Sequence, residues 1–183
     1  MPALLPADAF PICERLRAAH ATIRDELAGV PDDLWVGWPN QSDVYGDVRV
    51  LPLYLRHRPP TLPAIEDRVR SLCPGTWQHL ADDAMTLVFS RMQPGCHVRP
   101  HRDLDGPHHL RVHLGITVDA GAWMRVNGEP CHWTDGQCLV FDPRCTHEVR
   151  HQGTTPRTIL IVDFVPTQAE LTAAGCDHLH PLA

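Results

Sequence analysis

Short apolar segments separated by turn residues make up most of the chain from about residue 84 onward. The segments rich in strand-forming residues are 85–92, 109–118, 122–126, 138–141 and 158–165. Asn127-Gly128 is a strong signal for a two-residue hairpin turn, and Asp135-Gly136 marks a second turn. Regularly spaced short strands of this kind predict a β-sandwich or barrel.

The first part of the chain predicts helices. Apolar residues recur at helical spacing over 8–28, where Asp8 is a suitable N-cap and Gly29 a suitable end. A second helix is expected over 61–72, with Pro63 in its first turn and Cys73-Pro74-Gly75 as the stop.

Residues 48–55, between these helices, are rich in strand formers. The expected fold is therefore mainly β with N-terminal helices, a β-roll supported by a helical layer. We expect one domain over 1–183: a helical buttress and first strand in 1–83, a metal-binding core in 84–166, and a C-terminal tail in 167–183.

The composition argues against several classes of protein. A hydrophobic fraction of 43% and a charged fraction of 21% are ordinary for a globular chain. A net charge of −6 argues against a nucleic-acid partner. We find neither a signal peptide nor an apolar run long enough for a membrane span. The seven cysteines include no Cys-x-x-Cys pair, so a cytoplasmic protein with reduced thiols is expected.

The main candidate for chemistry is His101-Arg102-Asp103. Alternate residues of a strand share a face, so His101 and Asp103 can converge on one ion. His147, much later in the chain, can complete the set. Two histidines and one carboxylate with open positions suit a non-haem Fe(II) oxygenase. The pattern alone also fits ordinary histidines in a chain that contains 13 of them.

The surroundings favour the metal interpretation. Arg157 opens the apolar segment 158–162, where a guanidinium can hold a carboxylate through two parallel hydrogen bonds, as a 2-oxo dicarboxylic acid would require. Arg111 and His113 alternate with Val112 and Leu114, so polar residues are expected on one face of that strand. Asp135, Asp142 and Asp163 are interpreted as turn or structural residues. Trp35, Trp38 and Tyr54 fit either the core or a substrate cleft.

These residues resemble the aspartyl/asparaginyl β-hydroxylase family between about residues 47 and 165. The segments that carry the resemblance are Leu51-Pro52-Leu53-Tyr54, Phe89-Ser90, Pro94-Gly95, Pro100-His101, Leu110 to Ile116, Trp133-Thr134-Asp135-Gly136, Phe141-Asp142, His147-Glu148-Val149 and Arg157 to Asp163.

The resemblance implies a double-stranded β-helix (jelly-roll, cupin-like) fold, with Fe(II), 2-oxoglutarate and O2 as cofactor and cosubstrates. It implies His101 and His147 as iron ligands. It also implies that Ser90 and Arg157 hold the distal carboxylate of 2-oxoglutarate, with His113 near the other end. Arg111 would face a carboxylate or amide of the substrate.

The chain departs from the animal members of the family at two places. Asp103 stands where they have glycine, which restores a full two-histidine, one-carboxylate triad as in bacterial relatives, the proline hydroxylase branch included. The segment 104–109 is one residue longer and has His109 where the animal pattern has arginine. This segment is expected to border the substrate.

The expected activity is hydroxylation of a C–H carbon, in the first place the β-carbon of an aspartate, asparagine or related amino-acid unit. A free amino acid, a carrier-bound one and a peptide residue all stay open, and so does the oligomeric state. The alternatives are a hydroxylase of another free amino acid such as proline, a cupin-type metalloenzyme that does not use 2-oxoglutarate, and a non-enzymatic metal- or ligand-binding β-roll.

Overall fold

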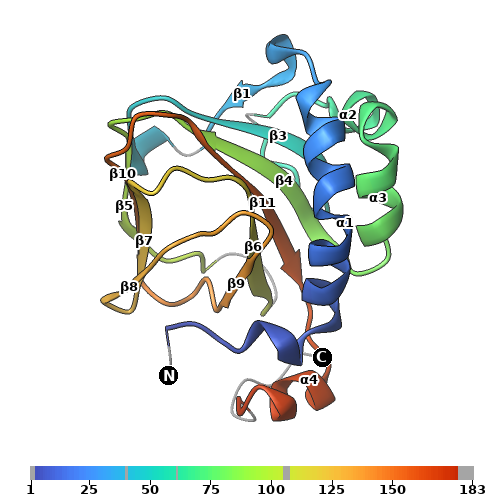
Figure 1. The fold of residues 1–183 in the computed structure, drawn as a ribbon, viewed down its shortest axis with the longest axis vertical. Helices are drawn as coiled ribbons and strands as arrows, with labels where there is room; N and C mark the ends of the chain where they lie inside the picture. Colours follow the sequence, from blue (N-terminus) through green and yellow to red (C-terminus); the bar gives the residue numbers. More distant parts are fainter. Residues whose placement is uncertain (1–2, 40, 61, 105–107, 177–183) are drawn as a thin grey trace.

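Two antiparallel sheets face one another in the structure, a computed structural model that describes residues 3–39, 41–60, 62–104 and 108–176. The large sheet has the order β1-β3-β4-β11-β6-β9 and the small sheet the order β2-β5-β10-β7-β8 (Figure 1). The large-sheet strands are β1 (Val36–Gly37), β3 (Val48–Leu55), β4 (Ala84–Met92), β11 (Arg157–Phe164), β6 (Leu110–Thr117) and β9 (Cys138–Phe141). The small-sheet strands are β2 (Val44–Tyr45), β5 (His97–His101), β10 (His147–His151), β7 (Ala122–Val126) and β8 (Glu129–Cys131).

The chain crosses repeatedly between the sheets. It passes from β4 in the large sheet to β5 in the small one, returns to β6, and crosses again to β7 and β8. Strands β9, β10 and β11 repeat the alternation. This winding defines a double-stranded β-helix, or jelly roll, and confirms the fold class expected from the sequence.

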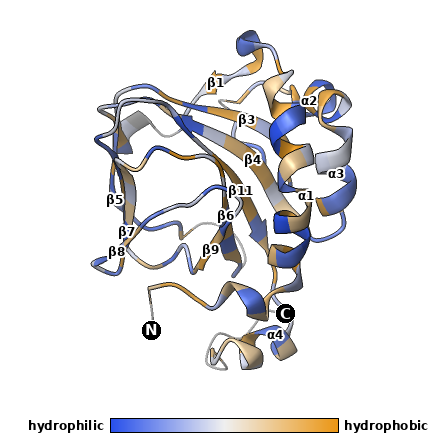
Figure 2. Cartoon of the chain, viewed as in Figure 1, coloured by the Kyte–Doolittle hydropathy of each residue, from blue (hydrophilic) through white to orange (hydrophobic). Residues whose placement is uncertain are grey.

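Helices cover one face of the large sheet, and the small sheet faces the other (Figure 1). The α-helices are α1 (Pro11–Ala28), α2 (Glu66–Leu72), α3 (Pro74–Leu80) and α4 (Gln168–Ala173), and three 3-10 turns are η1 (Ala7–Ala9), η2 (Asp32–Leu34) and η3 (Gln41–Asp43). Figure 2 shows that α1 carries both apolar and hydrophilic stretches, as expected of a helix with one buried face.

Strand β11 separates two buried clusters because its side chains alternate between faces. Leu160 and Val162 pack with the α1 helix, whereas Ile159 and Ile161 pack with residues of the small sheet. The second face of β11 also carries Arg157 and Asp163. The interior between the sheets is therefore where polar side chains gather.

The first helix begins three residues later than expected, at Pro11, and Asp8 is not its cap. Phe10 occupies the N-cap position without a side-chain hydrogen bond, and the Asp8 carboxylate instead accepts a 2.7 Å bond from Arg17. Proline at the first helical position has a backbone already suited to the helix and needs no N–H partner.

The second helix ends at Leu72 as expected, but it begins only at Glu66, so the expectation that Pro63 lies in its first turn is wrong. The expected start at residue 61 lies outside the described residues. Pro74, interpreted as part of a stop signal, also opens α3. The backbone N–H groups of Gly75 and Thr76 donate to the Glu26 carboxylate of α1, so a distant residue caps this helix.

The strands expected at 48–55, 122–126 and 138–141 have those bounds, and those expected at 85–92, 109–118 and 158–165 agree within one residue at either end. Asn127 and Gly128 both have positive φ, 49° and 85°, as a two-residue turn of type I′ requires, and they join β7 to β8. Strands β1, β2, β5 and β10 and the helices α3 and α4 were not expected.

Helix α4 lies in the segment interpreted as a tail, whose residues 177–183 are outside the described residues. The division of the chain into buttress, core and tail stays a prediction. Among the described residues, no helix combines the length and apolar character needed to span a membrane.

Candidate active site

Two histidines from neighbouring strands of the small sheet form the centre of the site. His101 is the last residue of β5 and His147 the first of β10, and the antiparallel register places them directly opposite each other. Their ring centroids are 4.2 Å apart. Strand pairing therefore brings together two residues that lie far apart in the sequence.

Backbone carbonyls fix the orientation of both rings. His101 Nδ1 lies 2.7 Å from the Arg99 carbonyl oxygen, and His147 Nδ1 lies 2.9 Å from that of Cys145. An oxygen acceptor at Nδ1 requires the proton on that nitrogen, so the Nε2 lone pairs are available for a metal. Burial and the nearby His101 lower the pKa of His147 to about 4, so its ring is neutral at neutral pH.

Asp103 completes a group whose ligand atoms all lie within 4.8 Å of one another. Its Oδ1 is 3.8 Å from His101 Nε2 and its Oδ2 is 4.0 Å from His147 Nε2. Burial raises the pKa of Asp103, but Arg111, His147 and His101 outweigh this and hold it below 3.8. Two imidazoles, each with its Nδ1 directed at a backbone carbonyl, and one carboxylate suit a divalent first-row metal ion, so the donor set fits Fe(II).

Arg111 points into the interior, but two carboxylates already accept hydrogen bonds from its guanidinium. Its Nε and Nη2 donate to the two oxygens of Asp163 at 2.7 and 3.0 Å, and its Nη1 donates to Asp103. Asp163 is thus no turn residue: it lies within β11 and faces the site. Asp135 and Asp142 do have the expected structural role, accepting the backbone N–H groups of Val118 and Arg144.

Arg157 is a buried cation, 2% exposed, for which the described residues provide no carboxylate partner. Its Nη1 reaches the Ser90 backbone oxygen at 3.4 Å, its Nη2 reaches the Met92 sulfur at 3.3 Å, and its Nε has no hydrogen-bond partner. The guanidinium carbon lies 4.8 Å from the centre of the Trp133 ring. Burial lowers the pKa of Arg157 to about 9, which shows how strongly this position disfavours an uncompensated charge.

His113 and Ser90 lie in the same interior, both buried. The His113 ring stacks on Trp133 with 6.0 Å between centroids, and its Nδ1 has no hydrogen-bond partner. Burial, together with Arg111, Arg157 and His147, lowers the pKa of His113, so this ring is neutral.

A narrow cavity of about 40 Å³ lies between the sheets. It is lined by His101, His147, Arg111, His113, Ser90, Arg157, Trp38, Val48, Val98, Val149, Ile159 and Ile161.

An apolar cleft of about 200 Å³ adjoins this cavity on the side of Asp103 and Arg111. Trp38, Arg111 and Ile161 line both spaces, so the cleft and the cavity meet at the candidate metal site. The other cleft residues are Pro39, Val50, Leu55, His57, Pro59, Leu62, Thr86, Val88, Asp103 and Asp163. Apart from the ion pairs at its inner end, the cleft presents mainly hydrocarbon.

The structure thus brings together all seven residues selected from the sequence: His101, Asp103, His147, Arg111, Ser90, His113 and Arg157. Sequence reasoning missed Asp163 as the partner of Arg111 and gave no specific place to Trp133. The sequence did contain one indication of the position of Asp163. Asp163 and Arg157 are an even number of residues apart in one strand, so their side chains are expected on the same face of the sheet. Of the three aromatic residues left undecided, Trp35 belongs to the helix-side core, Tyr54 packs on Trp77, and Trp38 lines the site.

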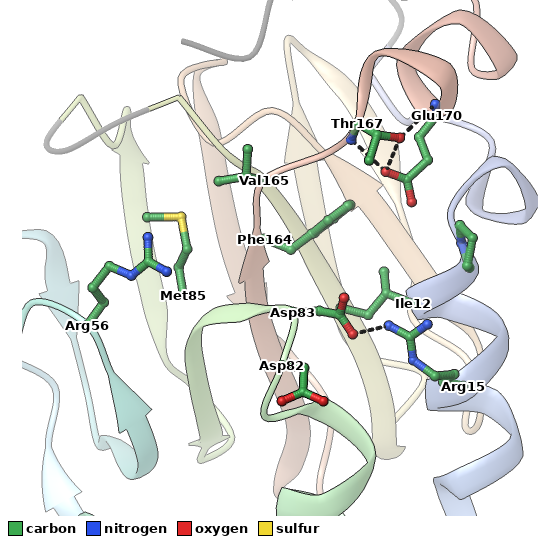
Figure 3. A pocket seen from close by; sticks show the side chains of 11 residues that line it. Ile12, Arg15, Arg56, Asp82, Asp83, Met85, Phe164, Val165, Thr167 and Glu170 are labelled. Carbon is green, nitrogen blue, oxygen red and sulfur yellow. Dashed lines mark hydrogen bonds and ion pairs between the residues drawn. The ribbon is translucent and has the colours of Figure 1, made fainter. Parts of the chain in front are cut away.

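A separate hollow of about 450 Å³ lies where α1 and α4 meet the ends of β4 and β11 (Figure 3). Its floor contains Met85 and Phe164, and its rim contains the Arg15–Asp83 ion pair and the exposed Arg56 (Figure 3). It shares no lining residue with the cavity or the cleft, so it is not part of the candidate active site.

The fold and the site define a class of protein: a double-stranded β-helix with a two-histidine, one-carboxylate candidate metal site between its sheets. The sequence profile of the aspartyl/asparaginyl β-hydroxylases matches residues 17–166. The chain belongs to the aspartyl/asparaginyl β-hydroxylase family.

Two relatives show the breadth of this similarity. The chain is 31% identical over 170 residues to an ornithine lipid ester-linked acyl 2-hydroxylase of Rhizobium tropici, covering 85% of this chain and 58% of that protein. It is 29% identical over 170 residues to aspartate β-hydroxylase domain-containing protein 2 of Xenopus tropicalis, covering 82% of this chain and 43% of that protein. The chain therefore spans about half the length of these relatives.

A solved structure shares the fold. An oxidoreductase of the 2OG-Fe(II) oxygenase family from Burkholderia pseudomallei superposes with a TM-score of 0.54 at 18% identity, covering 79% of this chain and 77% of that one. At this identity the likeness concerns the fold alone.

Proposed function

We propose that this protein is an Fe(II)- and 2-oxoglutarate-dependent hydroxylase. The observation that carries the proposal is Arg157, a buried cation without a carboxylate partner among the described residues, in the same cavity as His101 and His147. A buried charge is stable only when it is paired, and an anionic ligand would supply the missing partner. The cupin-type alternative without 2-oxoglutarate and the non-enzymatic alternative give no reason for such a residue.

His101, Asp103 and His147 would hold the iron and leave the remaining coordination positions open. When bound, Fe(II) supplies the redox chemistry by which O2 converts 2-oxoglutarate to succinate and CO2 and hydroxylates a C–H bond. Arg157 would pair with the distal carboxylate, assisted by the Ser90 hydroxyl, and His113 would lie near the other end.

The substrate expected from the resemblance is an amino-acid unit: aspartate, asparagine or a related residue, free, carrier-bound or in a peptide. Arg111 lines the cleft and keeps N–H donors beyond those given to Asp163 and Asp103, so it would contact a substrate oxygen there. Hydroxylation of another amino acid such as proline would use the same metal ligands and the same contact with Arg111.

The cleft favours a second candidate, hydroxylation of an aliphatic chain. Val50, Leu62 and Val88 form a buried apolar cluster beside it, and Asp163 and Asp103 already compensate the charge of Arg111. Apolar walls and a compensated cation suit hydrocarbon better than an acidic side chain. The relative from Rhizobium tropici is named for an acyl 2-hydroxylation.

One experiment tests the activity and separates the substrates. The purified protein is incubated with Fe(II), 2-oxoglutarate and either a panel of amino acids and short peptides or a panel of acyl lipids. We expect iron-dependent succinate release, matched by a product that has gained one oxygen atom in one panel only. His101→Ala is the control for the metal. Succinate formation that is indifferent to iron and to this substitution would contradict the proposal.

A further inference from the structure

Arg111 and Asp163 form a cross-strand ion pair whose geometry is set by the large sheet. Asp163 of β11 lies directly opposite Arg111 of β6 in the strand register. Two hydrogen bonds, of 2.7 and 3.0 Å, join the guanidinium to both carboxylate oxygens. Such a two-point contact fixes the plane of the guanidinium as well as its position.

Asp103, by contrast, lies outside the strands, two residues after the end of β5. Its side chain is 34% exposed, whereas those of Arg111 and Asp163 are 15% and 7% exposed. Its backbone is held by a 3.0 Å bond from its N–H to the Pro143 carbonyl, but that bond does not orient the carboxylate. Among the described residues, the ion pair between Asp103 Oδ2 and Arg111 Nη1 does so.

We propose that Asp163, acting through Arg111, is a positioning residue for the metal-binding carboxylate of Asp103. The strand pair holds Arg111, and Arg111 holds one oxygen of Asp103, so that the carboxylate keeps its orientation toward His101 and His147. His109, whose Nε2 lies 3.7 Å from Asp163 Oδ2, also contacts this group. The proposal rests on the metal site proposed above.

The main role of Arg111 then concerns the metal ligand. Two of its hydrogen bonds go to Asp163 and the third goes to Asp103. We therefore expect Arg111 to affect metal affinity more than the recognition of a charged substrate. Partners that orient a metal ligand typically affect metal affinity about 10- to 100-fold when they are removed. An effect of this size is measurable without any turnover.

The test measures the binding of Co(II) to the metal-free protein. Equilibrium dialysis gives the affinity, and the visible spectrum of bound Co(II) reports on its ligands. Asp163→Asn keeps the shape of the side chain but frees Arg111, and should weaken Co(II) binding about 10- to 100-fold and alter the spectrum. Arg111→Lys keeps the positive charge but loses the fork, and should also weaken binding. A purely electrostatic effect of Asp163 would leave Arg111→Lys like the wild type.

Glu26→Gln is the matched control, because Glu26 is a hydrogen-bonded carboxylate that caps α3 outside the site. It should alter stability but leave the affinity and spectrum of Co(II) unchanged. If Asp163→Asn and Arg111→Lys bind Co(II) like Glu26→Gln, the positioning role is refuted. If the wild type itself fails to bind one Co(II) that depends on His101, the proposed metal function fails instead.

Discussion

Arg157 illustrates a conflict between stability and ligand binding in a single side chain. The guanidinium is removed from water and faces a backbone carbonyl, a thioether and an indole ring instead of a carboxylate. Each of these contacts compensates a positive charge only in part. The folded protein therefore retains a partly compensated buried charge, and a bound anion would stabilise it.

Replacing Arg157 with methionine should consequently have opposite effects on stability and on binding. We expect the free energy of unfolding of the ligand-free protein to stay the same or rise by about 1 kcal/mol, because a buried uncompensated charge is removed. The affinity for 2-oxoglutarate should fall by about 2–5 kcal/mol, the usual loss for a charge-assisted pair. Urea denaturation and calorimetric titration with 2-oxoglutarate measure the two quantities.

Arg70→Met is a suitable comparison, because Arg70 is a half-buried arginine of α2 that pairs with Asp67 and lines neither the cavity nor the cleft. It should not change the affinity for 2-oxoglutarate. Equal affinities for Arg157→Met and the wild type would show that the cosubstrate carboxylate binds elsewhere.

Among the connections between elements, Asp119 joins two loops at one end of the β-roll. It accepts hydrogen bonds from the N–H of Gly121, near its own position, and from the N–H groups of Thr154 and Thr155 in the loop between β10 and β11. These donors, Thr155 first, hold the pKa of Asp119 well below its usual 3.8. The ionised carboxylate is therefore the form that stabilises the native state.

Asp119→Asn should lower the urea midpoint near neutral pH, since an amide oxygen cannot replace both carboxylate oxygens. A depressed pKa contributes stability that is complete above the unfolded-state value of 3.8, and this contribution is lost progressively as the pH falls through that value toward the lower folded-state pKa. The difference between wild type and variant should thus narrow between about pH 5 and pH 3. A difference that stays constant over that range would contradict the assignment.

The elements also show where sequence reasoning succeeds and where it stops. The apolar strands β4, β6, β7 and β11 are predictable because burial requires continuous β-branched and aliphatic residues. Strands β5 and β10 are not, since His97–His101 contains proline and His147–His151 is mostly polar. They become strands because they pair with each other and β10 also pairs with β7.

The same distinction holds for the site. Alternation along a strand predicted that Arg111 and His113 share one face, and motif spacing selected the two histidines and Arg157. The partners of these residues depend on the strand register. Asp163 contacts Arg111 because the register of β6 and β11 places these two residues opposite each other. Helix α3 was missed for a similar reason, because its cap, Glu26, comes from another helix.

For the whole molecule, the helical layer and the site occupy opposite faces of the large sheet. Leu16 of α1 is fully buried in the helix-side cluster, and Ile159 is buried on the face that lines the cavity. The two positions bury aliphatic side chains to the same extent, and they differ in the side of the sheet on which they lie.

Leu16→Ala and Ile159→Ala should each lower the free energy of unfolding by about 2–5 kcal/mol, through lost burial and the cavity that remains. Only Ile159→Ala should also weaken binding of 2-oxoglutarate, because only Ile159 lines the cavity. Denaturation and titration of both variants, at a temperature where both are folded, measure the outcome. Weakened binding in Leu16→Ala would show that the helical layer shapes the site.

His101 and His147 belong to the small sheet, whereas Ser90, Arg111, His113 and Arg157 belong to the large one. A metal ion and a dicarboxylate that contact each other would connect the two sheets across their interior. Binding of either should then make local opening of the sheets less frequent, and both together should do so by more than the sum of each alone. Slower hydrogen exchange at the amides of β10 and β11 would record this cooperativity directly.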